Sequence, residues 1–217
     1  MGTRLPEPGR PRLRGWIHAV AAPFVLAAGI VLTCRAPTVL AAAVAGVFAA
    51  TAAWLFAVSA LYHLGAWSRG ARLVLRRIDH VDILFLIAGT YTPLAVLALH
   101  GGTRVAILAV VWAGAALGGV LSIAWTGAPR WVYVPVYLGV GWAAACVLPQ
   151  LLHGAGPTAL VLIVAGGVLY SLGALAYGLK RPDPWPGWFG FHEVFHACTV
   201  AAFACQYVAV WIVACHA

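Results

Sequence analysis

Long runs of apolar residues recur along almost the whole of this 217-residue chain, and they constrain its fold more than any other feature. Hydrophobic residues make up 64% of the sequence and charged residues only 8%, which leaves too little polar surface for a water-soluble domain. A run of about 20 apolar residues is long enough to cross the hydrocarbon core of a bilayer as a helix. The sequence therefore predicts an integral membrane protein.

Seven such runs are separated by short segments that are rich in turn residues or charge. Lipid offers no partner to backbone groups, so each run is predicted to be a helix, and the alternating pattern of a membrane β-barrel is not seen. The predicted fold class is therefore all-α and polytopic, with a basic arm at 1–15 that its prolines predict to be disordered. The seven transmembrane helices are predicted at residues 16–34, 38–63, 80–99, 103–125, 131–152, 157–179 and 190–214, within one domain at 16–217.

The basic residues are distributed unevenly between the two ends of these helices. With seven crossings, eleven of the 13 Lys and Arg residues lie on the side of the N-terminus, and only Arg35 and Arg104 lie on the other. Short cytoplasmic loops are enriched in Lys and Arg, so the N-terminus is predicted to be cytoplasmic and the C-terminus outside. The same rule accounts for the net charge of +8, and no nucleic-acid partner is predicted. The five cysteines form no CxxC pair, which argues against disulfides and against a cysteine zinc site.

Ionisable side chains occur in three segments that are remote in sequence but reach the same cytoplasmic membrane depth. Such residues mark functional sites, because charge is expensive within a bilayer. The ionisable residues are His63 in "SALYHL", Asp79, His80 and Asp82 in "RRIDHVDILF", and His192, Glu193 and His196 in "FGFHEVFHACTV". The polar residue Ser59 lies one turn before His63.

The spacing of His192 and His196 places both imidazoles on one face of a helix, where they can bind one metal ion. Together with Glu193 they satisfy H-E-x-x-H, in which the histidines hold Zn²⁺ and the glutamate is a general base. Catalytic zinc usually has three protein ligands and a water, and His63 is the natural third ligand. Asp79 is the best carboxylate to hold or deprotonate that water, with Ser59 as a supporting contact.

A purely structural interpretation exists for each of these residues. A single histidine near a membrane surface commonly snorkels or pairs helices, and Asp79 could cap its helix or pair with Arg76 and Arg77. Asp82 lies three residues after Asp79 and could share its polar face. The i, i+4 pair at the depth of His63 and Asp79 favours a metal site. The structural interpretation is kept for His18, His80, His100, His153 and His216.

Three stretches, "SALYH", "RRIDHVDILFLIAGTYTP" and "GWFGFHEVFH", resemble the hallmark motifs of the hemolysin III family within the progestin and adipoQ receptor superfamily. The resemblance extends from residue 16 onward. It implies seven transmembrane helices in a plasma membrane, of bacterial origin, with zinc near the cytosolic face. The implied ligands are His63, His192 and His196.

The same resemblance places Asp79 beside the metal water and Ser59 one turn before the first histidine ligand. Two positions depart from the pattern. Asp82 stands where a small or uncharged residue is expected, and Glu193 is not general in the superfamily. Asp82, Glu193 and His80 are therefore kept only as candidates for contacts around the ligands.

Relatives in the wider superfamily are similar to amidohydrolases of the ceramidase kind. The resemblance thus implies a zinc-dependent hydrolase that acts on acyl amide or ester bonds of membrane lipids. The main alternative is a structural zinc in a non-enzymatic regulator or sensor of membrane lipid composition. "HEVFH" alone would fit an intramembrane metalloprotease, although no acidic residue follows His196. The family name suggests a pore, but the predicted helices carry no ring of charges.

Overall fold

The computed structural model describes residues 11–125 and 129–216, which are helical apart from loops and one isolated bridge between Trp185 and Phe189. The all-α fold class is therefore confirmed. The elements are α1 (Trp16–Arg35), α2 (Val39–Leu64), α3 (Arg69–Ala98), α4 (Gly101–Ala124), α5 (Arg130–Gly141), the 3-10 helix η1 (Trp142–Val147), α6 (Leu148–Leu179) and α7 (Phe191–Cys215).

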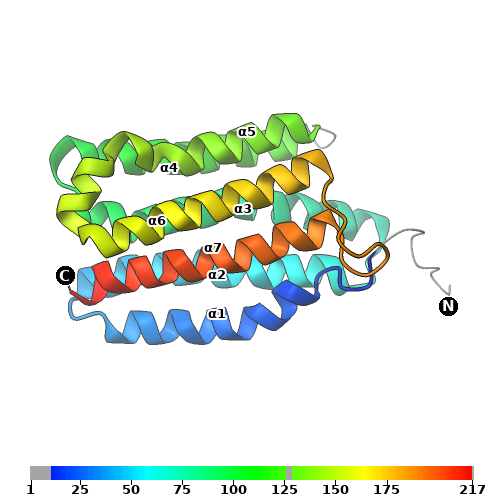
Figure 1. Cartoon of the computed structure of the whole chain (residues 1–217), viewed down its shortest axis with the longest axis horizontal. Coiled ribbons are helices and arrows are strands. Elements are labelled where there is room, and N and C mark those ends of the chain that lie inside the picture. Colours follow the sequence, from blue (N-terminus) through cyan, green and yellow to red (C-terminus); the bar gives the residue numbers. More distant parts are fainter. Residues whose placement is uncertain (1–10, 126–128, 217) are drawn as a thin grey trace.

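Six segments of the described chain are long and apolar enough to cross a membrane, so the protein is an integral membrane protein. One of them, Arg130–Leu179, combines α5, η1 and α6 over 50 residues. A straight helix of that length would extend about 75 Å, more than twice the thickness of the hydrocarbon core. The chain instead bends at Gly156, where φ is 80° and ψ is 166°, a conformation that requires glycine. Figure 1 shows α5 and α6 running in opposite directions.

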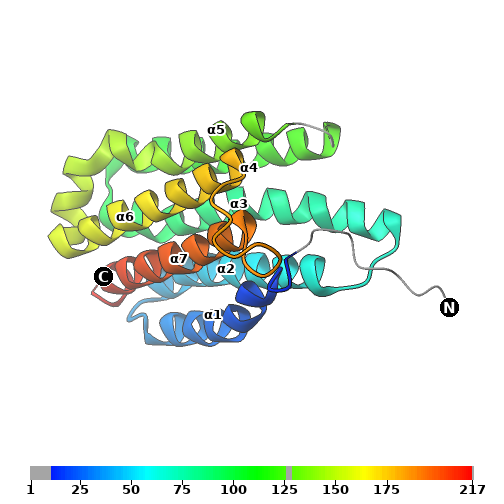
Figure 2. The same ribbon diagram turned by 45° about the vertical axis from the view of Figure 1, so that its right-hand side comes forward.

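Helix α3 begins at Arg69, eleven residues before the start that was predicted at residue 80. The Ser68 hydroxyl caps the helix by accepting a hydrogen bond of 3.3 Å from the Ala71 backbone N–H. Figure 2 shows the first turns of α3 extending beyond the neighbouring helices. The predicted boundary was wrong because hydropathy marks the apolar part of a helix, whereas capping determines where the helix begins.

Helices α3 and α7 occupy the centre of the bundle. Helix α3 packs against α2, α4, α5, α6 and α7, and α7 packs against α1, α2, α3 and α6. Helices in lipid associate through close contacts between small residues. A Cβ on Gly89 of α3 would lie 2.0 Å from the Thr51 hydroxyl oxygen of α2, and one on Gly154 of α6 would lie 1.9 Å from the Ala98 carbonyl oxygen. Glycine therefore sets the close approach of α3 to both neighbours.

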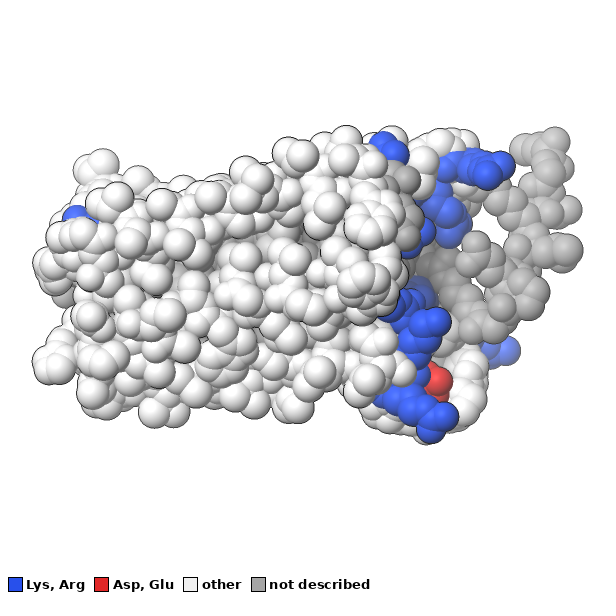
Figure 3. Space-filling model, turned by 90° about the horizontal axis from the view of Figure 1, so that it is seen from above, with Lys and Arg blue, Asp and Glu red and all other residues white. Residues whose placement is uncertain are grey.

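The end of α2, the start of α3 and the start of α7 lie together at one end of the bundle (Figure 1). Figure 3 shows Lys and Arg gathered at this end, whereas the long sides of the visible face are almost free of charge. Arg35 and Arg104 lie at the opposite end, at the end of α1 and in the first turn of α4.

Part of the predicted arm at 1–15 packs against the loop before α7. The Arg12 and Leu13 backbone N–H groups donate to the carbonyl oxygens of Gly187 and Trp188, at 3.0 and 3.2 Å. The Arg12 guanidinium lies 4.5 Å from the centre of a Trp188 ring. Residues 1–10 of the arm lie outside the described residues. The described part of the arm thus covers the start of α7.

Candidate metal centre

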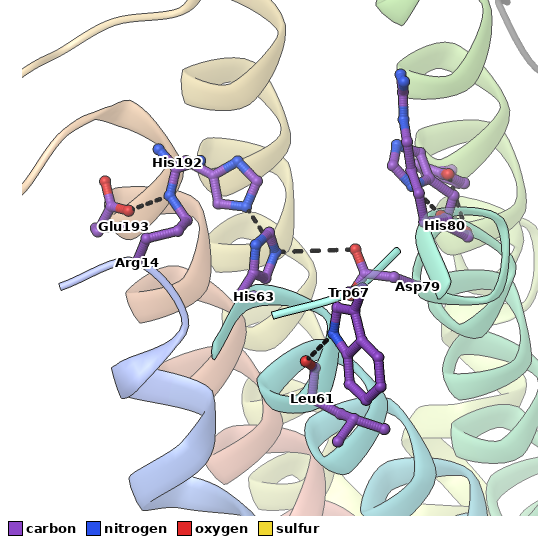
Figure 4. A network of polar contacts seen from close by, with 10 residues as sticks. Arg14, Leu61, His63, Trp67, Asp79, His80, His192 and Glu193 are labelled. Atoms are coloured by element: carbon purple, nitrogen blue, oxygen red, sulfur yellow. Dashed lines mark hydrogen bonds and ion pairs between the residues drawn. The ribbon is translucent and has the colours of Figure 1, made fainter. Parts of the chain in front are cut away.

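Three histidines from two helices converge at the basic end of the bundle. His63 is in the last turn of α2, and His192 and His196 are in the first two turns of α7, where the four-residue spacing places them on one face. One ring nitrogen from each lies within 4.8 Å of the other two. The Nε2 atoms of His63 and His192 are 3.2 Å apart (Figure 4). The structure therefore brings together the three histidines that the sequence predicts as ligands.

One pair of this donor set has the separation that a zinc ion requires, and all three ligand nitrogens lie within 4.8 Å of one another. Ligand nitrogens at about 2.0–2.1 Å from a tetrahedral zinc lie about 3.3 Å from one another, close to the separation of the His63 and His192 nitrogens. His63 and His196 are buried and His192 is partly buried. Three neutral imidazoles are suitable ligands, and their number leaves one position of a tetrahedron for water or substrate. The cluster thus provides three nitrogen donors that could hold a metal ion.

Asp79 of α3 lies beside this cluster in the cavity wall. Its Oδ2 atom is 4.0 Å from His63 Nε2, which is too long for a hydrogen bond (Figure 4). The Ser59 side chain, one turn before His63 on α2, is buried and lies in hydrogen-bonding reach of the Asp79 carboxylate. Asp79 is therefore positioned by α2 and α3 beside the histidines, but it does not belong to the group of candidate metal ligands.

Glu193 points away from the three histidines. Its Oε1 atom pairs with the Arg14 guanidinium (Figure 4). Its Oε2 atom accepts a hydrogen bond of 2.8 Å from the Gly190 backbone N–H. The second contact caps the N-terminus of α7, as a capping-box glutamate does. The side chain is only 1% exposed, and both of its oxygens are occupied. The H-E-x-x-H spacing thus reflects a capped helix as well as the histidine pair.

Asp82 and His80 also lie outside the cluster. Asp82 is buried towards α2, where its Oδ1 atom accepts a hydrogen bond of 2.8 Å from the Trp54 indole N–H. The His80 Nδ1 atom is 2.7 Å from the Arg76 carbonyl oxygen, and its ring stands edge-on to Tyr133 of α5. Neither residue belongs to the group of ligand atoms that could share a metal.

His18 of α1 is a neighbour of the site that the sequence analysis missed. Its ring stacks on His196 with 3.8 Å between the centroids and 5° between the planes, and it meets the edge of Phe56. It is 2% exposed, so of the two structural roles expected of it the helix-pairing role fits and the snorkelling role does not. The available signal was its position one turn into the first helix, at the same end of the bundle as His63.

A cavity of about 550 Å³ opens beside the histidines, a size typical of small-molecule sites. Its wall includes the three histidines and Asp79, but not Glu193 or Asp82. Away from this polar region the wall becomes mainly apolar. The apolar part includes Leu55, Leu86, Leu94, Leu138, Ile163 and Val164 from α2, α3, α5 and α6.

Comparison with known protein families supports the grouping that the motifs suggested. The sequence model described as Haemolysin-III related matches residues 8–207, which include the whole of α2 and α3 and the part of α7 that carries its two histidines. The match covers most of the chain. This protein, with its bundle of apolar helices and its histidine cluster, therefore belongs to the Haemolysin-III related family of membrane proteins.

Proposed function

We propose that this protein is a zinc-dependent hydrolase of acyl amide or ester bonds in membrane lipids. The observation that carries the proposal is the convergence of His63, His192 and His196 in the wall of a cavity, with Asp79 beside them. His63 from α2 and the histidine pair from α7 would hold the ion. When bound, zinc lowers the pKa of water to about 7 and polarises a carbonyl group.

Asp79 is assigned the proton transfers of this reaction. Its carboxylate accepts a proton from the attacking water, whose oxygen bonds to the acyl carbon of the lipid. The bond from that carbon to nitrogen or oxygen breaks, and the proton passes from Asp79 to the leaving group. Ser59, one turn before His63 on α2, is assigned the role of holding the carboxylate in place. The products are a free fatty acid and an amine or alcohol.

The membrane arrangement that we propose has seven crossings, with a cytoplasmic N-terminus and the C-terminus outside. The bend at Gly156 supports two crossings within Arg130–Leu179, and the gathering of Lys and Arg at the end that holds the site supports the orientation (Figure 3). The site then lies on the cytoplasmic side of a plasma membrane, in a bacterial cell. Lipids of the inner leaflet could reach it sideways.

The occupied carboxylate of Glu193 favours lipid hydrolysis over an intramembrane protease. A metalloprotease of the H-E-x-x-H type needs this glutamate as its base. Here Glu193 is tied to Arg14 and the start of α7, outside the cavity. Asp79, in contrast to Glu193, lines the cavity.

The proposal is tested with purified protein reconstituted with acyl lipids, by measuring the release of free fatty acid. We expect release by the zinc-loaded protein, its loss after chelation, and its return when zinc is added back, because three histidines bind zinc reversibly. Thermal unfolding is recorded on the same samples. If zinc stabilises the fold while no lipid is consumed, the ion is structural and the protein is a regulator or sensor instead.

A further inference from the structure

The cavity is strongly basic at the end that opens beside the histidines. Its described wall contains five arginines, and Asp79 is the only carboxylate among the residues that line it. The predicted loop charges account for the presence of arginine at this end, but not for its position in a cavity wall. The five arginines are Arg14, Arg72, Arg76, Arg77 and Arg130.

Two of these arginines are held in place by other parts of the protein. Arg14 pairs with the buried Glu193. The Arg130 Nη1 atom donates a hydrogen bond of 2.9 Å to the Tyr177 carbonyl oxygen, and its guanidinium lies 4.3 Å from the centre of the Tyr177 ring. Stacking on an aromatic face leaves the edge of a guanidinium free to bind an anion. These two residues therefore form a fixed part of the wall.

Three arginines of α3 that line the cavity precede Asp79, the proposed reaction centre, along the helix. Arg72 and Arg76 precede Asp79 by seven and three residues, which corresponds to about 10 Å and about 4.5 Å along the helix axis. The Nε atom of Arg77 is buried and has no hydrogen-bond partner among the described residues. A buried guanidinium donor without an acceptor is costly unless an anion accepts from it.

The opposite direction along α3 is apolar. Ile83, Leu86 and Leu94 follow Asp79 on the cavity side, so one helix presents arginine, then the acid, then hydrocarbon. This order matches an acyl lipid whose anionic group lies a few bonds from its acyl carbonyl and whose chain continues beyond it. A neutral head would offer no anionic acceptor to the buried Nε atom of Arg77.

We propose that the cavity selects lipids with a phosphate-bearing headgroup, and that Arg76 and Arg77 bind this phosphate while the acyl bond lies at Asp79. Arginine binds phosphate through paired, charge-assisted hydrogen bonds, which neutral diacyl lipids cannot form. The placement of the acyl bond rests on the proposed hydrolase function. The selectivity for phosphate rests on the arginines alone and can be measured as binding.

The test compares two lipid probes with the same fluorescent acyl chain, phosphatidylglycerol and diacylglycerol, bound to detergent-purified Asp79→Asn protein so that neither is consumed. We expect phosphatidylglycerol to bind at least about tenfold more tightly. The double substitution Arg76→Gln/Arg77→Gln should reduce that preference about tenfold or more. Arg69→Gln is the matched control, because Arg69 lies on the same helix but does not line the cavity, and it should change the preference less than about twofold.

Equal binding of the two probes would overturn the proposal, and so would an equal loss in the Arg69 and Arg76/Arg77 variants, since that indicates general attraction to a basic surface. Displacement of phosphatidylglycerol by inorganic phosphate at about 10 mM would identify a site for a free anion and also overturn it. If the glutamine variant does not fold, the preference for phosphatidylglycerol over diacylglycerol is measured instead in the Arg76→Lys/Arg77→Lys variant and in the wild-type protein, and these two values decide. Preference without turnover contradicts only the hydrolase function, whereas turnover without preference contradicts only this inference.

Discussion

Asp79→Asn is expected to abolish lipid hydrolysis while zinc remains bound. Asparagine has nearly the same shape as aspartate but cannot accept the proton of the attacking water, and a positioned acid or base contributes about 10²–10⁴-fold to a rate. The histidines are not altered, and Asp79 Oδ2 lies 4.0 Å from the nearest of their ligand nitrogens. The measurements are fatty-acid release and the zinc content of the same preparation.

Asp82→Asn is the matched control for this substitution. Asp82 lies on the same helix, but it accepts a hydrogen bond from Trp54 and does not line the cavity. The rate of lipid hydrolysis by the Asp82→Asn variant should stay within about threefold of the wild-type rate. An Asp79→Asn protein that hydrolyses lipid at the wild-type rate would remove Asp79 from the mechanism. Loss of zinc in that variant would instead make Asp79 part of the metal binding.

Removal of either buried histidine of the cluster, His63 or His196, should abolish metal binding. His63→Ala and His196→Ala each leave two protein ligands where a catalytic zinc requires three, so the zinc content should fall from about one per chain to below about 0.1. A ligand present at about 1,000 times its dissociation constant stabilises the folded state by about 4 kcal/mol, so the thermal unfolding temperature should fall as well. Elemental analysis and thermal unfolding in detergent measure the two effects.

His80→Ala provides the comparison for the histidine variants. His80 lies at the same end of the bundle, with its Nδ1 atom near the Arg76 carbonyl oxygen and outside the ligand group. It should keep a full complement of zinc. A zinc content that is unchanged in both His63→Ala and His196→Ala would show that the metal binds elsewhere or does not bind at all.

Much of the fold follows from patterns that the physics of the bilayer makes strict. The apolar runs predicted most of the α-helices, and the segment "HGAGP" predicted the break that the structure places at Gly156. The single helix predicted at 131–152 was wrong, because the structure has α5, the 3-10 helix η1 and the start of α6 there. The start of α3 was missed because its first turns carry arginine rather than apolar residues. Hydropathy therefore identifies the part of a helix that lies in lipid, and it underestimates helices that continue into water.

The histidine pair was predictable because both residues belong to one helix, whose geometry is fixed. His63 required the further step of counting crossings, which predicted that the end of one helix and the start of another lie at the same membrane depth. Glu193 could not be placed from this pattern alone. One residue turns a helix by about 100°, so Glu193 leaves the histidine face, and its partner Arg14 lies in an arm that gave no signal of tertiary contact.

His18 shows a second limit of the sequence. Helix α1 is apolar around most of its circumference, so nothing in its pattern determines which face turns towards α7. The stacking of His18 on His196 depends on that rotation and on packing between helices. The arginines of the cavity are a similar case. Charge counting predicted the side of the membrane on which they lie, but not that their side chains line a cavity.

X-ray absorption at the zinc edge of the purified wild-type protein tests the central claim most directly. The geometry of His63, His192 and His196 predicts zinc with three histidine nitrogens and one oxygen at about 2.0–2.1 Å. A spectrum dominated by sulfur at about 2.3 Å, or protein that retains no zinc after purification with zinc present, would contradict it.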